Sequence, residues 1–372
     1  MQEKESKQHF NSDYDIMIVG GGPAGISTWL HLHKYCPELA AKCVLIEKEK
    51  YPRDKLCGGA ILNVGQNVLK QLNVHLDIPF VSINNTEYRL GKEVFYHKER
   101  NFLQIIRRIE FDYMLVKVAI GRGLQLKQDE ALLNLSRTKN DRITVETNKE
   151  KYNVKVLIGA DGAISKVRNK MDLPKKPHLA AALEIFAPVN PNYDKEFATN
   201  TAVMDFTPMV EDLQGYVWHF PCIKDGKPSM SHGICHAQIN TEKKHPDLKT
   251  IFTQELKKRK ISLTPSAWSG HPVPWLVEES PLSESNILLV GDAAGIEPLI
   301  GGGIHLSLWY GEVAALSIID AYDRNDFSFE RYTDQIKSHI LGKYIRQSIY
   351  LASEVYHDRM KILDVMQKIT KR

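Results

Sequence analysis

Apolar residues gather in short runs near the start of the chain, and their spacing predicts the first elements of the fold. Residues 14–19 form an apolar run of strand type that enters a glycine cluster. Residues 23–34 have helical spacing, and residues 43–47 are a second apolar run. Because short apolar runs bounded by turn residues are typical of buried strands, this order predicts one strand–helix–strand unit.

The rest of the chain divides into a strand-rich middle and a helical end. Helical spacing predicts helices over residues 62–74 and 111–121. Further strands are expected over residues 83–106, 124–135, 143–147, 152–158 and 287–290. Residues 180–270 alternate apolar and polar positions, and the pattern is helical from residue 304 onward. If the first and last strands share one sheet, that domain is discontinuous and contains an inserted β-rich unit.

Composition and charge exclude several classes of protein. The 372 residues are 43% hydrophobic and 25% charged, as in ordinary globular proteins. No apolar run reaches the roughly 18 residues of a membrane-spanning helix. A net charge of +4 without a long basic run does not indicate a nucleic-acid partner. Residues 1–13 are polar, lack the apolar core of a secretory signal, and are expected to form a flexible tail.

Cysteine usage favours a reducing compartment. The chain has five cysteines, an odd number, and none are spaced as CxxC. A disulfide framework or a zinc site is therefore not expected, and we expect no metal. The cytoplasm is the simplest location for such a chain.

The glycine cluster after the first strand carries the first chemical signal. Gly20, Gly22 and Gly25 follow the pattern GxGxxG between a strand and a helix, and Glu47 closes the next strand. The first glycine permits a tight turn, the second lets a pyrophosphate approach, and the third lets the helix pack on the strand. The helix N-terminus then attracts the phosphates, and Glu47 accepts hydrogen bonds from a ribose. The motif predicts a dinucleotide site but does not separate FAD from NAD.

Three further segments resemble the para-hydroxybenzoate hydroxylase superfamily of FAD enzymes. Residues 158–163 resemble its Asp-Gly motif, with Asp161 and Gly162, and residues 288–295 resemble its Gly-Asp motif, with Gly291 and Asp292. Arg108 begins a segment similar to the helix whose arginine lies near the cofactor. The resemblance implies that Asp292 holds a ribityl hydroxyl and that a helix N-terminus after residue 300 points at the flavin.

Two motifs resemble the geranylgeranyl reductase family within that superfamily. Residues 56–60, with Cys57 and Gly58, are similar to its Cys-Gly-Gly segment. Residues 216–221 fit its Tyr-x-Trp-x-Phe-Pro motif, whereas flavin-dependent halogenases place Trp-x-Trp-x-Ile-Pro there. The resemblance implies a reductase of carbon–carbon double bonds in a prenyl or other apolar substrate, with FAD as cofactor. NADPH or a reduced electron carrier, such as an electron-donor protein, is the expected external reductant.

The resemblance and the glycine motif together name the candidate site residues. The expected FAD contacts are Gly20, Gly22, Pro23, Ala24, Gly25, Glu47, Lys48, Cys57, Gly58, Arg108, Asp161, Gly162, Gly291, Asp292, Pro298, Gly301, Gly302, Gly303 and Ile304. The expected substrate contacts are Tyr216, Trp218, Phe220, Pro221 and Glu297. Cys57, His219 and His305 are candidate proton donors, since thiol and imidazole groups transfer protons readily.

The fold class expected from these signals is α/β: a discontinuous Rossmann-type FAD-binding domain with an inserted antiparallel β-rich substrate domain and C-terminal helices. The FAD-binding domain is expected over residues 14–80, 100–178 and 275–320, the β-rich domain over 81–99 and 179–274, and the helical segment over 321–372.

Three alternatives remain open at the level of sequence. The chain lacks a second dinucleotide motif, so an aromatic-ring monooxygenase of the same superfamily fits as well as a reductase. A prenyl-binding protein without flavin, of the escort or dissociation-inhibitor type, is disfavoured because Asp292 and Gly301–Gly303 are present. The basic C-terminal stretch, residues 332–372, is interpreted as a helical cap on the β-rich unit, with peripheral membrane contact as the other option.

Overall fold

The computed structural model describes residues 14–138, 140–173, 178–261, 269–277, 280–297, 299, 301–358 and 360–370. The expected tail at residues 1–13 and the expected cofactor contact Pro298 lie outside the described residues.

A six-stranded sheet forms one half of the molecule. Its order is β16 (Ser283–Glu284), β17 (Ile287–Leu289), β10 (Val156–Gly159), β1 (Ile16–Val19), β2 (Cys43–Glu47) and β6 (Gln125–Gln128). All neighbours pair in parallel except β16 with β17. Every residue of β1, β2, β10 and β17 is buried, which explains the unbroken apolar runs in their sequences.

Helices cover this sheet and bring distant parts of the chain together. Helix α1 (Pro23–Tyr35) packs along α8 (Gly303–Arg324), and α4 (Arg108–Gly121) contacts α1. The two long helices approach closely, because a Cβ on Gly311 would lie 2.4 Å from Ser27 Oγ. The same half contains α2 (Pro37–Ala40), α3 (Asn63–Gln71), α5 (Lys166–Lys170), α9 (Tyr332–Ser338) and the small sheet β7 (Leu132–Arg137), β8 (Ile143–Thr147) and β9 (Lys151–Val154).

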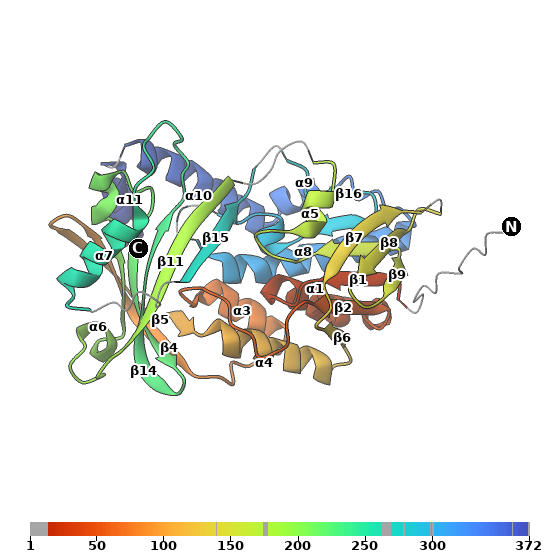
Figure 1. Cartoon of the computed structure of the whole chain (residues 1–372), viewed down its shortest axis with the longest axis horizontal. Helices are drawn as coiled ribbons and strands as arrows, with labels where there is room; N and C mark the ends of the chain where they lie inside the picture. Colours follow the sequence, from red (N-terminus) through yellow and green to blue (C-terminus); the bar gives the residue numbers. More distant parts are fainter. Residues whose placement is uncertain are drawn as a thin grey trace, which may run out of the picture.

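An eight-stranded sheet forms the other half, at the opposite end of the molecule (Figure 1). Its order is β15 (Ser269–Trp275), β11 (His178–Pro188), β14 (Lys227–His236), β13 (Val217–Lys224), β12 (Thr201–Asp205), β4 (Phe80–Leu90), β5 (Glu93–Ile106) and β3 (Ala60–Leu62). The pairing is antiparallel except between β12 and β4. Strand β5 runs to Ile106, past the expected boundary at residue 99. Around this sheet lie α6 (Lys195–Ala198), η1 (Thr207–Glu211), α7 (Leu248–Lys258), α10 (Ile340–His357) and α11 (Lys361–Thr370).

Two of the expected strands are each divided between two sheets. The segment 124–135 breaks at Asp129, whose φ of 55° is left-handed, so β6 joins the parallel sheet and β7 the small sheet. The segment 152–158 breaks after Val154, because the amides of Lys155 and Val156 both turn to the carbonyl of Asp15. Both predictions of a single strand were wrong, since a hydrophobic pattern does not show where pairing changes from one sheet to another.

The end of α10 and helix α11 lie on the eight-stranded sheet, whereas α9 and the start of α10 pack in the core of the cofactor half. Val355 and Tyr356 of α10, together with Ile362 and Met366 of α11, belong to the same buried cluster as Phe206. The interpretation of the C-terminal stretch as a cap on the β-rich unit therefore holds for its later part, and not for α9 and the start of α10. Within the described part of the chain, no helix is long and apolar enough to cross a membrane. The expected α/β fold class, with its inserted β-rich sheet and C-terminal helices, is confirmed.

Candidate functional site

One large cavity, of about 1260 Å³, lies between the two halves. The glycine turn between β1 and α1, the loop after β2 and the start of α8 form its polar end. The inner face of the eight-stranded sheet and helices α10 and α11 line its apolar end. Nearly all the candidate residues chosen from sequence therefore face a single space, which joins two halves that are far apart along the chain.

The glycine turn has the geometry of a phosphate site. Gly20 has a φ of +107°, and a Cβ there would lie 2.3 Å from the carbonyl oxygen of Ala160. A Cβ on Gly22 would meet only the Arg108 guanidinium, at 4.0 Å, so this side of the turn faces the cavity. Helix α1 has no side-chain cap and no acidic residue in its first turn. Its free N–H groups and dipole are therefore available to an anion.

A buried network of charges holds the turn in place. Glu47 Oε2 accepts a hydrogen bond from the Gly21 N–H at 3.0 Å and pairs with Arg53 at 3.2 Å. Arg53 also pairs with Asp112 at 3.0 Å, and Asp112 in turn accepts two hydrogen bonds from Arg108. The network joins the end of β2 to helix α4. Glu47 lines the cavity, and so do Lys48, Pro23 and Ala24.

A second helix N-terminus faces the cavity at α8. Its N-cap, Gly302, offers no side-chain cap, and the first turn of α8 contains no acidic residue. Glu297 is fully buried and accepts hydrogen bonds from the N–H groups of Leu299, at 2.7 Å, and Gly302, at 2.9 Å. Its carboxylate therefore shapes the loop that enters α8. Glu297 lines the cavity, together with Gly301, Gly302, Gly303 and Ile304.

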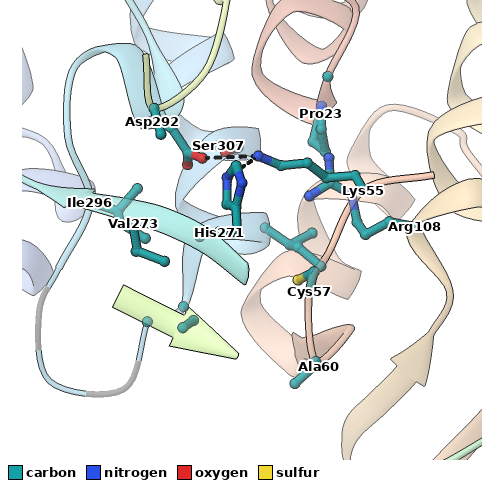
Figure 2. A pocket seen from close by; sticks show the side chains of 18 of the residues that line it. Pro23, Lys55, Cys57, Ala60, Arg108, His271, Val273, Asp292, Ile296 and Ser307 are labelled. Atoms are coloured by element: carbon teal, nitrogen blue, oxygen red, sulfur yellow. Dashed lines mark hydrogen bonds and ion pairs between the residues drawn. The ribbon is translucent and has the colours of Figure 1, made fainter. Parts of the chain in front are cut away.

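Asp292 faces a lysine that the motifs did not indicate. Lys55 Nζ lies 3.9 Å from Asp292 Oδ2 and hydrogen-bonds to His271 Nε2. Figure 2 shows the end of the lysine side chain pointing toward these two side chains, with Arg108 beside the lysine. Burial lowers the pKa of Lys55, and burial together with the Lys55 charge lowers the pKa of His271 to about 4. A cation therefore lies beside the aspartate expected to hold the ribityl chain.

The remaining glycine and aspartate motifs shape the same end of the cavity. Asp161 and Gly162 line the cavity, but the Asp161 carboxylate accepts hydrogen bonds from Ser165 Oγ and from the Lys166 and Val167 N–H groups. It therefore also caps α5. Gly291 and Gly25 do not line the cavity. Each permits close packing, since a Cβ on Gly291 would lie 2.6 Å from Ala24 and one on Gly25 would lie 2.1 Å from the Gly20 carbonyl.

An aromatic wall forms the side of the cavity that faces the eight-stranded sheet. Tyr216, Trp218 and Phe220 all line it, at alternate positions leading into and along β13. Tyr216 and Trp218 meet edge to face, with ring centroids 6.3 Å apart. Pro221, the next residue, is not among the lining residues and pairs with Met230 across the sheet. Further lining residues at this end are Tyr88, Phe102, Met204, Phe206, Leu351, Ile362, Val365 and Met366.

The three candidate proton donors have different surroundings. Cys57 and Gly58 line the cavity beside the aromatic wall, and burial raises the pKa of the Cys57 thiol. His219 points away from the cavity, is 2% exposed, and hydrogen-bonds to His232 at 2.7 Å on the opposite face of β13. We therefore propose no proton transfer from His219. The alternation of facing directions along a strand explains this orientation, because Trp218 and Phe220 on either side of His219 face the cavity.

His305 does line the cavity, near the start of α8. It is 1% exposed, and neither ring nitrogen has a hydrogen-bond partner among the described residues. Burial lowers its pKa to about 4, so the imidazole is neutral near pH 7. Its ring packs edge to face against Trp309 and Tyr344.

These residues fit FAD, because two uncapped helix N-termini and a glycine turn without side chains face one cavity. Residues 13–308 match the family described as FAD binding domain. The chain belongs to this family. It is an FAD-dependent oxidoreductase, as the motifs predicted. No group of three or more metal-binding side chains occurs in the described ranges.

Relatives support the expected resemblance to geranylgeranyl reductases. Digeranylgeranylglycerophospholipid reductase 3 of Methanosphaera stadtmanae is 27% identical, over 95% of this chain and 89% of the relative. The fold is similar to a geranylgeranyl bacteriochlorophyll reductase-like protein of Thermoplasma acidophilum, with a TM-score of 0.73, 19% identity, and coverage of 93% and 87%. It is also similar to PqsL, a probable FAD-dependent monooxygenase of Pseudomonas aeruginosa, with a TM-score of 0.71, 14% identity, and coverage of 95% and 99%.

Four residues of the site were not identified from the sequence: Arg53, Lys55, Glu184 and His271. Arg53 and Lys55 lie in the same charged loop as Cys57. This short distance along the chain was a sequence signal that could have identified them as site residues. Glu184 on β11 and His271 on β15 belong to no motif. Only the sheet order brings them beside the cavity loop.

Proposed function

We propose that this flavoenzyme reduces carbon–carbon double bonds of a prenyl or other apolar small molecule. The observation that carries the proposal is the continuity between the cofactor end of the cavity and its aromatic wall at Tyr216, Trp218 and Phe220. A long apolar ligand in this space lies against the wall at one end and reaches the cofactor end with the other. Similarity to a digeranylgeranylglycerophospholipid reductase supports a substrate of this class.

FAD held by the glycine turn, Asp292 and the N-terminus of α8 would, in its reduced form, supply a hydride for the double bond, and a proton would complete the reduction at the neighbouring carbon. NADPH or a reduced carrier, which can be a protein, restores the two electrons and is the second substrate of our proposal. The chain's own residues position the substrate and exclude water. Leu351 of α10 and Ile362 and Met366 of α11 line the apolar end, and their apolar side chains favour desolvation of an apolar ligand.

Cys57 is the proton donor that we favour. It lines the cavity between the cofactor end and Trp218, and burial keeps its thiol protonated by raising its pKa. His305 is the alternative, but burial favours its neutral form, which gives up a proton far less readily than the imidazolium. The five free cysteines are compatible with our proposal that the enzyme acts in a reducing cytoplasm, with at most peripheral contact with a membrane.

A second candidate is hydroxylation of an aromatic substrate with O₂. The fold likeness to PqsL, over nearly all of both chains, favours it. The same aromatic wall accommodates a planar ligand, and the motifs contain no second dinucleotide site that separates the two reactions. A flavin-free prenyl-binding role is the third option, and Asp292 together with the α8 N-terminus argues against it.

Anaerobic mixing separates the candidates. The yellow protein is reduced without oxygen and then mixed either with geranylgeranyl diphosphate or with oxygen and an aromatic ligand, while flavin absorbance is followed. Re-oxidation with a product heavier by pairs of hydrogen atoms supports the reductase. Re-oxidation by oxygen alone, with a hydroxylated aromatic product, supports the monooxygenase. A colourless protein that takes up no FAD contradicts both enzyme proposals and supports the binding protein.

A further inference from the structure

A buried carboxyl group lies directly behind the Cys57 segment. Glu184 on β11 is 1% exposed and is not one of the cavity-lining residues. Its Oε2 accepts a hydrogen bond from the Cys57 N–H at 3.2 Å, and its Oε1 accepts one from Ser231 Oγ at 2.6 Å. Ser231 Oγ in turn accepts a hydrogen bond from Trp218 Nε1 at 3.0 Å. One carboxyl group therefore links the Cys57 loop to the tryptophan of the aromatic wall.

The contact between loop and wall is close. A Cβ on Gly58 would lie 3.2 Å from Trp218 Nε1 and 3.4 Å from Phe220. Gly59 has a φ of +77°, and its N–H donates to Cys57 Sγ at 3.4 Å. The Cys57–Gly59 segment is thus pressed against the wall with its sulfur at the cavity. The hydrogen bond that the Cys57 N–H donates to the Glu184 carboxyl group anchors the backbone of this segment on the side away from the cavity.

Burial of the Glu184 carboxyl group favours its neutral form over its charged form. Burial raises the pKa of Glu184 to about 7, although Ser231, the Arg107 charge and the Cys57 N–H act in the opposite direction. Strongly shifted groups beside a cavity often have a functional role. A purely structural link between strands is made more stably by neutral groups, because a buried charge opposes folding.

The charged and titratable groups around the pair come from four elements. Burial is the largest cause of the raised pKa of the Cys57 thiol. Among the charges, Arg108 on α4 and Lys55 on the loop favour the thiolate, whereas Glu184 on β11 disfavours it. Glu184 itself faces Arg107 and Asp54. Tyr216 beside Cys57, and Cys222 beside Glu184, are both held neutral by burial, which raises their pKa values. Two cations thus favour loss of the thiol proton, and Glu184 is the anion that opposes them.

We propose that Glu184 is a positioning residue that anchors the Cys57 backbone against the aromatic wall and, once ionised, adds its negative charge to the effect of burial, so that both oppose loss of the Cys57 thiol proton beside the cations of the cofactor end. The use of that proton in catalysis rests on the proposed function. The anchoring and the charge effect do not, since they involve only groups of this chain.

Glu184→Gln is the direct test, because the amide keeps the shape and a hydrogen-bond acceptor but removes the charge. The Cys57 thiolate is measured in the FAD-loaded protein in two ways: by the pH at which a thiolate-to-flavin charge-transfer absorbance appears, and by the pH dependence of iodoacetamide labelling of the Cys57 peptide, read by mass spectrometry. We expect the midpoint of both to fall by about one pH unit in E184Q. E184D, which keeps the charge, should stay near the wild-type midpoint.

Glu196→Gln is the matched control. Glu196, on α6, is also a buried carboxylate. It pairs with Arg259 at 2.8 Å and does not line the cavity. Removing the charge of Glu196 should leave the pH midpoint of the Cys57 thiolate unchanged. An unchanged midpoint in a folded E184Q overturns the proposal. If E184Q does not fold, the wild-type protein provides the test. A pH midpoint for the Cys57 thiolate below the ordinary thiol pKa of about 8.5 would also overturn the proposal. Labelling needs no flavin, so failure of the proposed function, seen as absence of FAD or of prenyl reduction, is distinguishable from failure of this inference.

Discussion

The indole ring of Trp218 lies over Gly233, its partner on the neighbouring strand, in the space that a side chain would fill. The two residues are directly paired between β13 and β14. A Cβ on Gly233 would lie 2.0 Å from Trp218 Cζ2 and 2.4 Å from Cε2. The missing side chain therefore determines how far the wall of the cavity is recessed, and Trp218 has its position only because residue 233 is glycine.

Gly233→Ala should displace the indole into the cavity. The added methyl group overpacks the contact, which typically lowers the free energy of unfolding by about 1–3 kcal/mol. We expect the dissociation constant for a prenyl ligand such as geranylgeranyl diphosphate to rise by about tenfold, and FAD affinity to stay within about twofold. Titration of each ligand by flavin or tryptophan fluorescence checks this. Gly121→Ala, at the end of α4 with open space around it, is the control and should change neither constant.

Asp292→Ala should weaken FAD binding. A hydrogen bond to a charged group contributes about 1.5–3 kcal/mol, so we expect the FAD dissociation constant to rise at least about tenfold. Quenching of FAD fluorescence measures the constant directly, without any substrate. Asp320→Ala removes an exposed aspartate that pairs with Arg324 on α8 and should bind FAD normally. Equal affinity in D292A and wild type would show that the ribityl contact lies elsewhere.

His305 should make the protein less stable in acid. Its pKa in the fold is about 4, below the ordinary value of about 6.5 in an unfolded chain. The unfolded chain therefore binds a proton below pH 6.5 that the fold does not accept. The stabilisation is complete above pH 6.5 and is lost as the pH falls toward 4, by up to about 3 kcal/mol.

Urea unfolding of His305→Leu at pH 7 and pH 5 tests this sign. The variant should lose less free energy of unfolding between the two pH values than the wild type does. At pH 7 it should remain within about 1 kcal/mol of the wild type, because neither ring nitrogen has a partner within the described ranges. The exposed His75→Leu should retain the wild-type pH dependence. If the free energy of unfolding of H305L fell between pH 7 and pH 5 by as much as that of the wild type, the lowered pKa assigned to His305 would be contradicted.

Arg53→Met should destabilise the fold far more than loss of a surface ion pair. Arg53 is largely buried and pairs with both Glu47 and Asp112, so its removal leaves buried carboxylates short of a counter-charge. We expect a loss of about 3 kcal/mol in the free energy of unfolding. Arg324→Met, which breaks the exposed pair with Asp320, should lose less than about 0.5 kcal/mol. Comparable losses in the two variants, measured by urea unfolding, would argue against the buried network.

Local pattern was sufficient for the first strand–helix–strand unit of the cofactor half. The apolar runs of β1 and β2, the glycine turn and the start of α1 lie within a few dozen consecutive residues, and each has a steric requirement that shows in the sequence. Gly20 and Gly22 could be assigned tasks because only glycine permits the turn and the open face. The alternation that turns Trp218 toward the cavity also turns His219 away from it, although we did not draw the second conclusion from sequence.

Tertiary structure alone decided which residues surround the Cys57 thiol. Glu184, Ser231 and Trp218 lie on three neighbouring strands, and their side chains meet only because β11, β14 and β13 pair in that order. Lys55 and His271 meet in the same way across the cavity. Hydrophobic period and motif spacing report the local conformation of the chain, whereas these contacts depend on strand register and sheet order. Burial, which shifts the pKa values of Glu184 and His305, is likewise a property of the whole fold.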